Sequence, residues 1–260
     1  MEVWQAIVLG IVQGVAEFLP ISSSGHLLIL QEVFGVEQPG ITFDVVLHIG
    51  SLCAVLAVFW RDILSLVRNP FQKMSFMLIV GTLPAVVAGF LLRDFMELFQ
   101  HALYLAAAFV FTGILLLIAD NITQVHKTEK EMSVLDALIV GCMQAVALPP
   151  GISRSGATIT GGLVTGLTRE TAARFSFLLS IIAIVGAGTL EVVEGGFAYV
   201  YMGNIPAYMI GFVAAAVSGY YSIRLLLALI KKCQLKYFAY YVFILAALLL
   251  IDRFAIGYVF

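Results

Sequence analysis

The segment EFLPISSSGH, residues 17–26, places a carboxylate, three consecutive serines and an imidazole in a stretch that is otherwise apolar. Proline and serine interrupt a helix, because proline lacks the backbone N–H and serine competes for backbone hydrogen bonds. A second segment, LPPGISRSG at residues 148–156, has the same character. Each interruption lies in the middle of a longer region that is apolar at both ends, residues 2–36 and 133–167.

The surrounding composition is that of a membrane protein. Of the 260 residues, 62% are hydrophobic and 12% are charged, and the mean hydropathy is +1.04. A soluble domain cannot bury so much apolar surface, whereas apolar runs of roughly 20 residues cross a bilayer as helices. The net charge of -2 argues against nucleic acid as a partner. We therefore expect an all-α polytopic membrane protein with six transmembrane helices, near residues 42–60, 75–92, 103–119, 172–190, 206–230 and 236–258.

The two interrupted regions do not fit this pattern, because neither half of either region is long enough to cross the bilayer alone. Each is expected to form a re-entrant helical hairpin, which enters the membrane and returns to the same side. Irregular backbone at that depth must line a cavity or be buried in protein, since lipid satisfies no backbone hydrogen bonds.

The two regions also resemble each other. At an offset of 131 residues, AIVLGIVQGVAEFLPISSSGH aligns with ALIVGCMQAVALPPGISRSGA, and nine of the 21 positions are identical. The identities include polar pairs that apolar bias does not explain, namely Gln13/Gln144, Ser22/Ser153 and Ser24/Ser155. The pattern indicates a single membrane domain built from two repeats, residues 1–130 and 131–260.

Positive charge predicts how the repeats are oriented. Ten of the 14 basic residues fall in loops that the expected helices place on one side, which by the positive-inside rule is the cytoplasmic side: Arg61, Arg68, Lys73, Lys127, Lys130, Arg169, Arg174, Lys231, Lys232 and Lys236. Loops 31–42 and 191–206 and both termini are then external. One hairpin enters from outside and the other from inside, an inverted-topology repeat whose tips meet near the bilayer midplane.

Such a meeting point is suited to an anion. Half-helices that start at Ser22 and Ser153 direct free backbone N–H groups and positive dipole ends at a common spot. Arg154 adds a planar fork that matches phosphate oxygens, and phosphate is the favoured ligand because so many donors converge. The hydroxyl donors are those of Ser22, Ser23, Ser24, Ser153 and Ser155.

The positions at which the repeats differ carry reactive groups. Glu17 aligns with Leu148, Ser23 with Arg154, and His26 with Ala157. Ser23 and His26 are three residues apart and can share a helix face, so the imidazole can activate the hydroxyl or attack phosphorus itself. Glu17, four residues after Gln13, can hold a divalent cation that bridges phosphate oxygens.

Two structural alternatives remain. Glu17 and Arg154 can form an ion pair that only neutralises two buried charges. Asp44 and His48, one helical turn apart at the outer end of a predicted span, can form an interfacial cap without a direct role in the site.

The motifs resemble those of the undecaprenyl-diphosphatase (bacitracin-resistance) phosphatases of bacterial and some archaeal membranes. QGVAEFLPISSSGH at residues 13–26 is similar to the first signature of that family, and PGISRSGAT at residues 150–158 to the second. FDVVLHIGSLCAVLAVFWRDI and AARFSFLLSI resemble its connecting helices, so the resemblance extends nearly from end to end. One departure is Gln13, which stands where many members have glutamate.

This resemblance implies hydrolysis of a C55 polyprenyl diphosphate to the monophosphate lipid carrier, in the cytoplasmic (inner) membrane, at a site that opens to the outer, periplasmic face. It also implies a divalent cation, Mg²⁺ or Ca²⁺, held by Gln13 and Glu17. By position, the catalytic residues are Glu17, Ser23, His26 and Arg154. The substrate-binding residues are Ser22, Ser24, Gly25, Gln144, Gly151, Ser153, Ser155 and Thr158.

Three alternatives stay open. Ser23 is the favoured nucleophile, with His26 as its base, because its repeat partner is Arg154; His26 is the alternative nucleophile. A secondary transporter or lipid flippase for an anion also fits inverted repeats with broken helices. The expected partners are the lipid diphosphate and membrane lipids, and the working form is either one copy or a homodimer.

Overall fold

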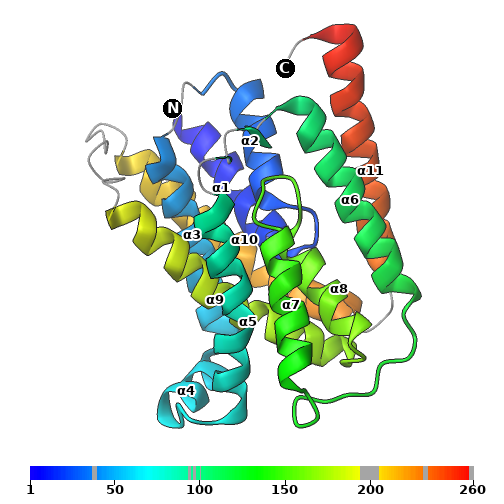
Figure 1. Cartoon of the computed structure of the whole chain (residues 1–260). Helices are drawn as coiled ribbons and strands as arrows, with labels where there is room; N and C mark the ends of the chain where they lie inside the picture. The colour runs from blue at the N-terminus through cyan, green and yellow to red at the C-terminus, as the bar shows by residue number, and fades with distance from the viewer. Residues whose placement is uncertain are drawn as a thin grey trace.

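The computed structural model describes residues 1–36, 40–92, 95, 98–99, 101–193, 205–230 and 234–257. Over this part of the chain the structure is helical and has no strand beyond one isolated bridge between Lys127 and Leu167 (Figure 1). The helices are α1 (Val3–Phe18), α2 (Ser23–Val33), α3 (Gly40–Val58), α4 (Trp60–Arg68), α5 (Lys73–Leu92), α6 (Ala102–Asn121), α7 (Val134–Val146), α8 (Arg154–Val164), α9 (Arg169–Val193), α10 (Ile205–Ile230) and α11 (Leu235–Ile251), followed by a π-helical turn (Asp252–Ile256).

Five of these helices are long and apolar enough to cross a membrane: α5, α6, α9, α10 and α11 with its π-helical turn. A sixth span results if α3 and α4, which meet at an angle of 81°, count as one. The six predicted spans therefore coincide with observed helices. The span predicted at 42–60 ends in a bend at Phe59, after which α4 has no buried residue.

Besides the nine-residue α4, the described chain has four further short helices, and they are the halves of the two interrupted regions. α1 and α7 have 16 and 13 residues, and α2 and α8 have 11 each. At 1.5 Å per residue even α1 is about 24 Å long, less than the roughly 30 Å of a hydrocarbon core. Ser22 and Ser153 are the N-caps of α2 and α8, which confirms the predicted helix starts.

Glycines let each of the short helices α1 and α7 pack closely against a long helix from the other half of the chain. A Cβ on Gly10 of α1 would lie 2.4 Å from the backbone oxygen of Gly211 on α10. A Cβ on Gly141 of α7 would lie 2.4 Å from the backbone oxygen of Gly81 on α5. Close backbone approach through small residues is how helices associate where lipid removes the hydrophobic driving force.

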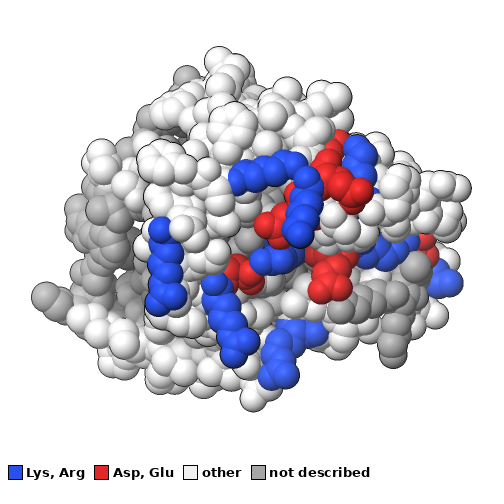
Figure 2. All heavy atoms as spheres, turned by 90° about the horizontal axis from the view of Figure 1, so that it is seen from below, with Lys and Arg blue, Asp and Glu red and all other residues white. Residues whose placement is uncertain are grey.

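The charged loops meet at one end of the molecule. Arg174 at the start of α9 forms ion pairs with Asp62 of α4 and, at 3.0 Å, with Glu129 of the α6–α7 connection. Lys73 Nζ donates to the Lys130 carbonyl oxygen at 2.6 Å. Figure 2 shows lysine, arginine and acidic side chains gathered on this face.

The opposite end carries the start of α1 and the ends of α2 and α11 (Figure 1). This arrangement agrees with the expectation that the basic loops share one end. Lys231 and Lys232 lie outside the described residues, as do parts of the predicted outer loops 31–42 and 191–206.

Candidate active site

The site is centred on one buried carboxylate, that of Glu17 in the last turn of α1. Its Oε1 accepts a hydrogen bond from Arg154 Nη2 at the start of α8. Its Oε2 accepts from Ser23 Oγ at 2.6 Å and from Gln13 Nε2 at 3.1 Å. Both interrupted regions therefore contribute to one cluster. The ion pair foreseen as the structural alternative is present, and it shares its carboxylate with the serine.

The turn between α1 and α2 places Ser23 against Glu17. In the described chain Ser22 is the one non-glycine residue with a positive φ, 69°, and this conformation turns the chain sharply after Pro20. Ser22 Oγ then accepts from the Gly25 N–H at 3.4 Å as the N-cap of α2. Because of this turn, the first residue of α2 faces the end of α1.

The tips of the two interrupted regions are in direct contact. Ser155 Oγ donates to the Leu19 carbonyl oxygen at 3.2 Å. A Cβ on Gly25 would lie 2.6 Å from the Phe109 ring and 3.1 Å from Gly151 Cα, so only glycine fits there without displacing its neighbours. Gly151 itself has φ +90°, a conformation that glycine adopts readily.

The second tip is fixed by a residue of α6. The Ser153 N–H donates to Thr112 Oγ1 at 3.0 Å, and Thr112 Oγ1 donates to the Gly151 carbonyl oxygen at 3.3 Å. Thr158 Oγ1 donates to the Arg154 carbonyl oxygen at 2.8 Å and lies 2.6 Å from Ser176 Oγ on α9. Thr158, expected to bind substrate, therefore contacts the backbone of Arg154 and a neighbouring helix.

Several buried polar atoms in the site have no hydrogen-bond partner in the part of the chain that the structure describes. They are Arg154 Nη1, Gln13 Oε1, and both side-chain polar atoms of Gln144. Gln144 occupies the repeat position of Gln13. A buried donor or acceptor without a partner is costly, so such a group in a site indicates a place for a ligand.

The structure places both ring nitrogens of His26 against groups other than Ser23. Its Nδ1 lies 2.7 Å from the Ser22 carbonyl oxygen and its Nε2 lies 2.8 Å from the Tyr241 hydroxyl on α11. A carbonyl oxygen only accepts, so Nδ1 carries a proton, and in the neutral ring Nε2 accepts from tyrosine. Both ring nitrogens are thus engaged away from Ser23. The carboxylate in contact with the Ser23 hydroxyl is that of Glu17.

Three residues around the site were missed as members of it. Tyr241 stacks on His26 with a ring distance of 5.6 Å and an interplanar angle of 9°. Thr112 anchors the second tip, and His48 Nε2 lies 3.6 Å from Glu17 Oε2. Only His48 had a signal in the sequence, its spacing of four residues from Asp44. Thr112 is an isolated polar residue of an apolar helix, and Tyr241 lies in an aromatic cluster that does not single it out.

The donor set is compatible with a hard divalent cation. Within the described residues there is no group of three or more histidine, cysteine, aspartate or glutamate side chains suited to a metal. The Glu17 carboxylate and Gln13 Oε1, which has no partner in the described chain, are nevertheless oxygen atoms of the kind that such a cation binds, and the two side chains are in contact through Gln13 Nε2. Mg²⁺ is often held by one or two protein oxygens together with substrate phosphates and water, which is the set available here.

Comparison with known proteins shows the family of this chain. Residues 6–248 match the model of the family described as "Bacitracin resistance protein BacA". The chain belongs to this family. It is 40% identical over 255 residues to an undecaprenyl-diphosphatase of Carboxydothermus hydrogenoformans, with 96% of this chain and 97% of that protein covered.

Two further relatives carry the same name. An undecaprenyl-diphosphatase of Rubrobacter xylanophilus is 43% identical over 269 residues, covering 95% of this chain and 97% of the relative. An undecaprenyl-diphosphatase of Methanosphaera stadtmanae is 38% identical over 274 residues, covering 96% of this chain and 98% of the relative. Membership of the BacA family therefore extends over both interrupted regions and the helices between them.

Proposed function

We propose that this chain is a membrane phosphatase that hydrolyses undecaprenyl (C55) diphosphate to undecaprenyl phosphate and inorganic phosphate. Relatives at about 40% identity over nearly the whole chain are named for this activity. The observation that carries the proposal is the arrangement of Ser23, Glu17 and Arg154. The Ser23 hydroxyl and the Arg154 guanidinium both donate to the buried Glu17 carboxylate. The three groups that a phosphoryl-transfer site requires therefore lie together.

In this proposal Ser23 is the nucleophile and Glu17 is its base. The Ser23 hydroxyl already donates to Glu17 at 2.6 Å, within the range for proton transfer. Serine oxygen attacks the terminal phosphorus, its proton passes to Glu17, and the bond from phosphorus to the bridging oxygen breaks to release undecaprenyl phosphate. Water then attacks the phosphoserine and restores the hydroxyl.

Arg154 binds the diphosphate while it keeps Glu17 in place. Nη2 is occupied by Glu17, whereas Nη1 is buried without a partner and is free to donate to phosphate oxygens. The planar guanidinium holds both groups at once. The N-terminal N–H groups of α2 and α8 add positive potential where charge develops on the transferred phosphoryl group.

The remaining polar residues complete the phosphate site. Two serine pairs flank the helix starts: Ser22 and Ser24 Oγ lie 3.4 Å apart, and Ser153 and Ser155 Oγ lie 3.3 Å apart. Each hydroxyl has one proton to donate. Ser155 already donates its proton to the Leu19 carbonyl oxygen, so we assign the donors for the anion to Ser22, Ser24 and Ser153. Gln144, whose amide has no partner, is the further donor we assign to the substrate.

We further propose that Gln13 and Glu17 hold a divalent cation, Mg²⁺ or Ca²⁺, together with the substrate. Bound there, such a cation neutralises charge on the phosphate oxygens. His26, which contacts Ser22 and Tyr241, supports the turn that carries Ser23 and is not assigned a proton-transfer step.

The architecture that fits these contacts is an inverted-topology repeat of residues 1–130 and 131–260, with re-entrant hairpins at 2–36 and 133–167. Packing supports it, since α1 packs on α10 while its repeat counterpart α7 packs on α5. The basic end is assigned to the cytoplasm, which puts both termini outside and opens the site to the outer face. All site residues belong to one chain, so a homodimer is not required for the site.

Phosphate release separates this proposal from a transporter or flippase. Purified protein in detergent with undecaprenyl diphosphate is expected to release inorganic phosphate, and Ser23→Ala is expected to abolish most of it. A transporter needs a sealed compartment and releases none. Wild-type protein that released no phosphate with Mg²⁺ or Ca²⁺ present would contradict the proposed function.

A further inference from the structure

His48 on α3 is a polar side chain beside Glu17 to which the serine step gives no role. Its Nδ1 lies 2.7 Å from the Asp44 carbonyl oxygen, so Nδ1 carries a proton and Nε2 of the neutral ring has a lone pair. That Nε2 lies 3.6 Å from Glu17 Oε2, which is also an acceptor. Two acceptors at this separation are satisfied together by a molecule with two protons to donate, namely water.

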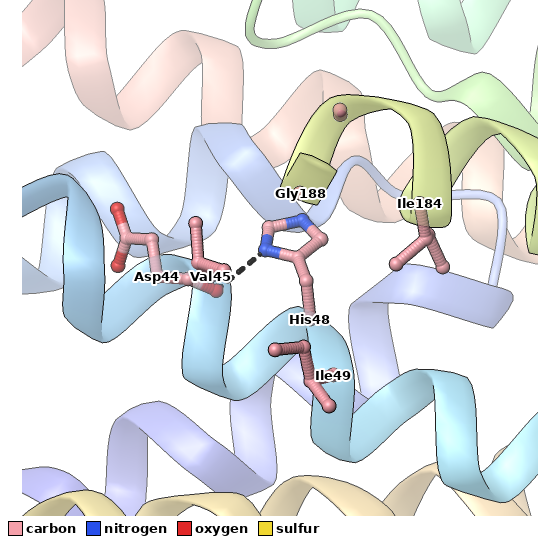
Figure 3. A pocket seen from close by; sticks show the side chains of 7 residues that line it. Asp44, Val45, His48, Ile49, Ile184 and Gly188 are labelled. Atoms are coloured by element: carbon pink, nitrogen blue, oxygen red, sulfur yellow. Dashed lines mark hydrogen bonds between the residues drawn. The ribbon is translucent and has the colours of Figure 1, made fainter. Parts of the chain in front are cut away.

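A cavity of about 290 Å³ is lined in part by His48 (Figure 3). It lies between α3 and α9 and is lined by Asp44, Val45, His48, Ile49, Ile184, Ala187 and Gly188. Since one water occupies about 30 Å³ in the liquid, the cavity has room for several. Its lining has a carboxylate and no cationic lysine or arginine, so it suits water better than a phosphate or a diphosphate.

The cavity also lies on the appropriate side of the molecule. Asp44 and His48 are in the first half of α3, and Ile184 and Gly188 are in the second half of α9. These segments lie toward the end of the molecule where α1 begins, away from the basic loops (Figure 1). Water in this cavity therefore meets His48, whose Nε2 lies 3.6 Å from Glu17 Oε2, and Arg154 is not among the residues that line it.

We propose that this cavity delivers the water that hydrolyses the phosphoserine, and that His48 is the positioning residue that holds this water against Glu17. The inference rests on the Ser23 step of the proposed function. The water oxygen forms a bond to phosphorus as the bond from phosphorus to Ser23 Oγ breaks. One water proton passes through Glu17 to Ser23 Oγ, while the other donates to His48 Nε2.

The test follows both half-reactions with undecaprenyl diphosphate that is radiolabelled in the terminal phosphate. Two variants of similar size, His48→Gln and His48→Leu, are compared with wild type by rapid quench. Leucine holds no water, so we expect a full burst of undecaprenyl phosphate followed by steady-state turnover lowered about 10²-fold, the order expected for a misplaced reactant. Labelled protein should accumulate. Glutamine accepts a hydrogen bond from water and should restore most of the turnover.

A second pair of variants tests the cavity without changing a polar group. Gly188 lines the cavity and Gly186 does not, and a Cβ on either residue would meet no atom within 4 Å. Gly188→Phe should fill the cavity, slow turnover and accumulate labelled protein as His48→Leu does. Gly186→Phe, in the same helix, should behave as wild type.

Other outcomes would overturn the inference. If His48→Leu slowed the burst of undecaprenyl phosphate as much as the steady-state turnover, His48 would be a support of Glu17. If turnover by His48→Gln were as slow as by His48→Leu, the result would point to a charged imidazolium. Equal behaviour of the two glycine variants would exclude the cavity as the route. Release of phosphate with no labelled protein in any variant would overturn the inference and the Ser23 step but leave the phosphatase activity established.

Discussion

Arg154 on α8 donates a hydrogen bond to Glu17 on α1, across a separation of 137 residues. Either charge alone at membrane depth costs on the order of 2.5–3.5 kcal/mol on insertion scales, so each residue stabilises the other there. The same contact joins the two interrupted regions into one site. It leaves the second guanidinium nitrogen without a partner and the second carboxylate oxygen bonded to Ser23.

Substitution of Arg154 tests whether the guanidinium fork or only its charge is needed. We expect Arg154→Lys to lose nearly as much kcat/KM as Arg154→Ala, roughly 10²–10³-fold, because lysine cannot hold Glu17 and the diphosphate in one plane. The measurement is phosphate release over a range of undecaprenyl diphosphate concentrations. A lysine variant that kept most of the rate would support a point charge instead.

Ser23 and Glu17 are expected to act as a unit. Ser23→Ala and Glu17→Gln should each lower kcat by several orders of magnitude, and the double variant should be little worse than either, since removal of one partner disables the other. Mass spectrometry of quenched wild-type protein should find the phosphoryl group on Ser23.

His26→Gln is the matched control for that pair, because His26 contacts Ser22 and Tyr241 but not Ser23. It should cost far less than Ser23→Ala. Phosphohistidine at position 26, together with phosphorylation of the Ser23→Ala variant, would assign the nucleophile to the histidine.

Close packing of α7 against α5 makes Gly141 sensitive to a single methyl group. In Gly141→Ala the new Cβ would lie 2.4 Å from the Gly81 backbone oxygen, so the helices must separate. Overpacking of this kind costs about 1–3 kcal/mol, and we expect a clearly lowered melting temperature in detergent. Gly89→Ala on the same α5 is the control, because its Cβ would meet no atom within 4 Å. An equal loss in both variants would argue against the close contact.

The orientation can be checked by cysteine labelling on intact cells. We expect Glu32→Cys at the end of α2 to react with an impermeant maleimide, and Phe71→Cys, between α4 and α5, to react only after permeabilisation. Phe71 is 101% exposed, so access to it is not limited by packing. Both variants need a background without the native Cys53, Cys142 and Cys233. Labelling of position 71 from outside would reverse the proposed topology.

Much of the fold was predictable because it depends on local signals. The long helices follow from apolar runs, and the starts of α2 and α8 follow from Ser22 and Ser153, whose side chains cap the next turn. The shared end of the basic loops follows from their charge. The bend at Phe59 was not predicted, because the charged residues from Arg61 to Lys73 indicated a loop after the span, whereas residues Trp60–Arg68 form the helix α4.

The sequence by itself identified Glu17, Ser23 and Arg154 as candidate site residues, because they stand at positions where two copies of one motif differ, and their chemistry follows from residue type. Only the tertiary structure decided how they pair. The positive φ of Ser22 directs Ser23 to Glu17 and not to His26, although Ser23 and His26 are three residues apart and could have shared a helix face. Three residues contact the site from distant helices: Tyr241, Thr112 and His48. No local sequence pattern predicts such contacts, because they depend on how whole helices pack.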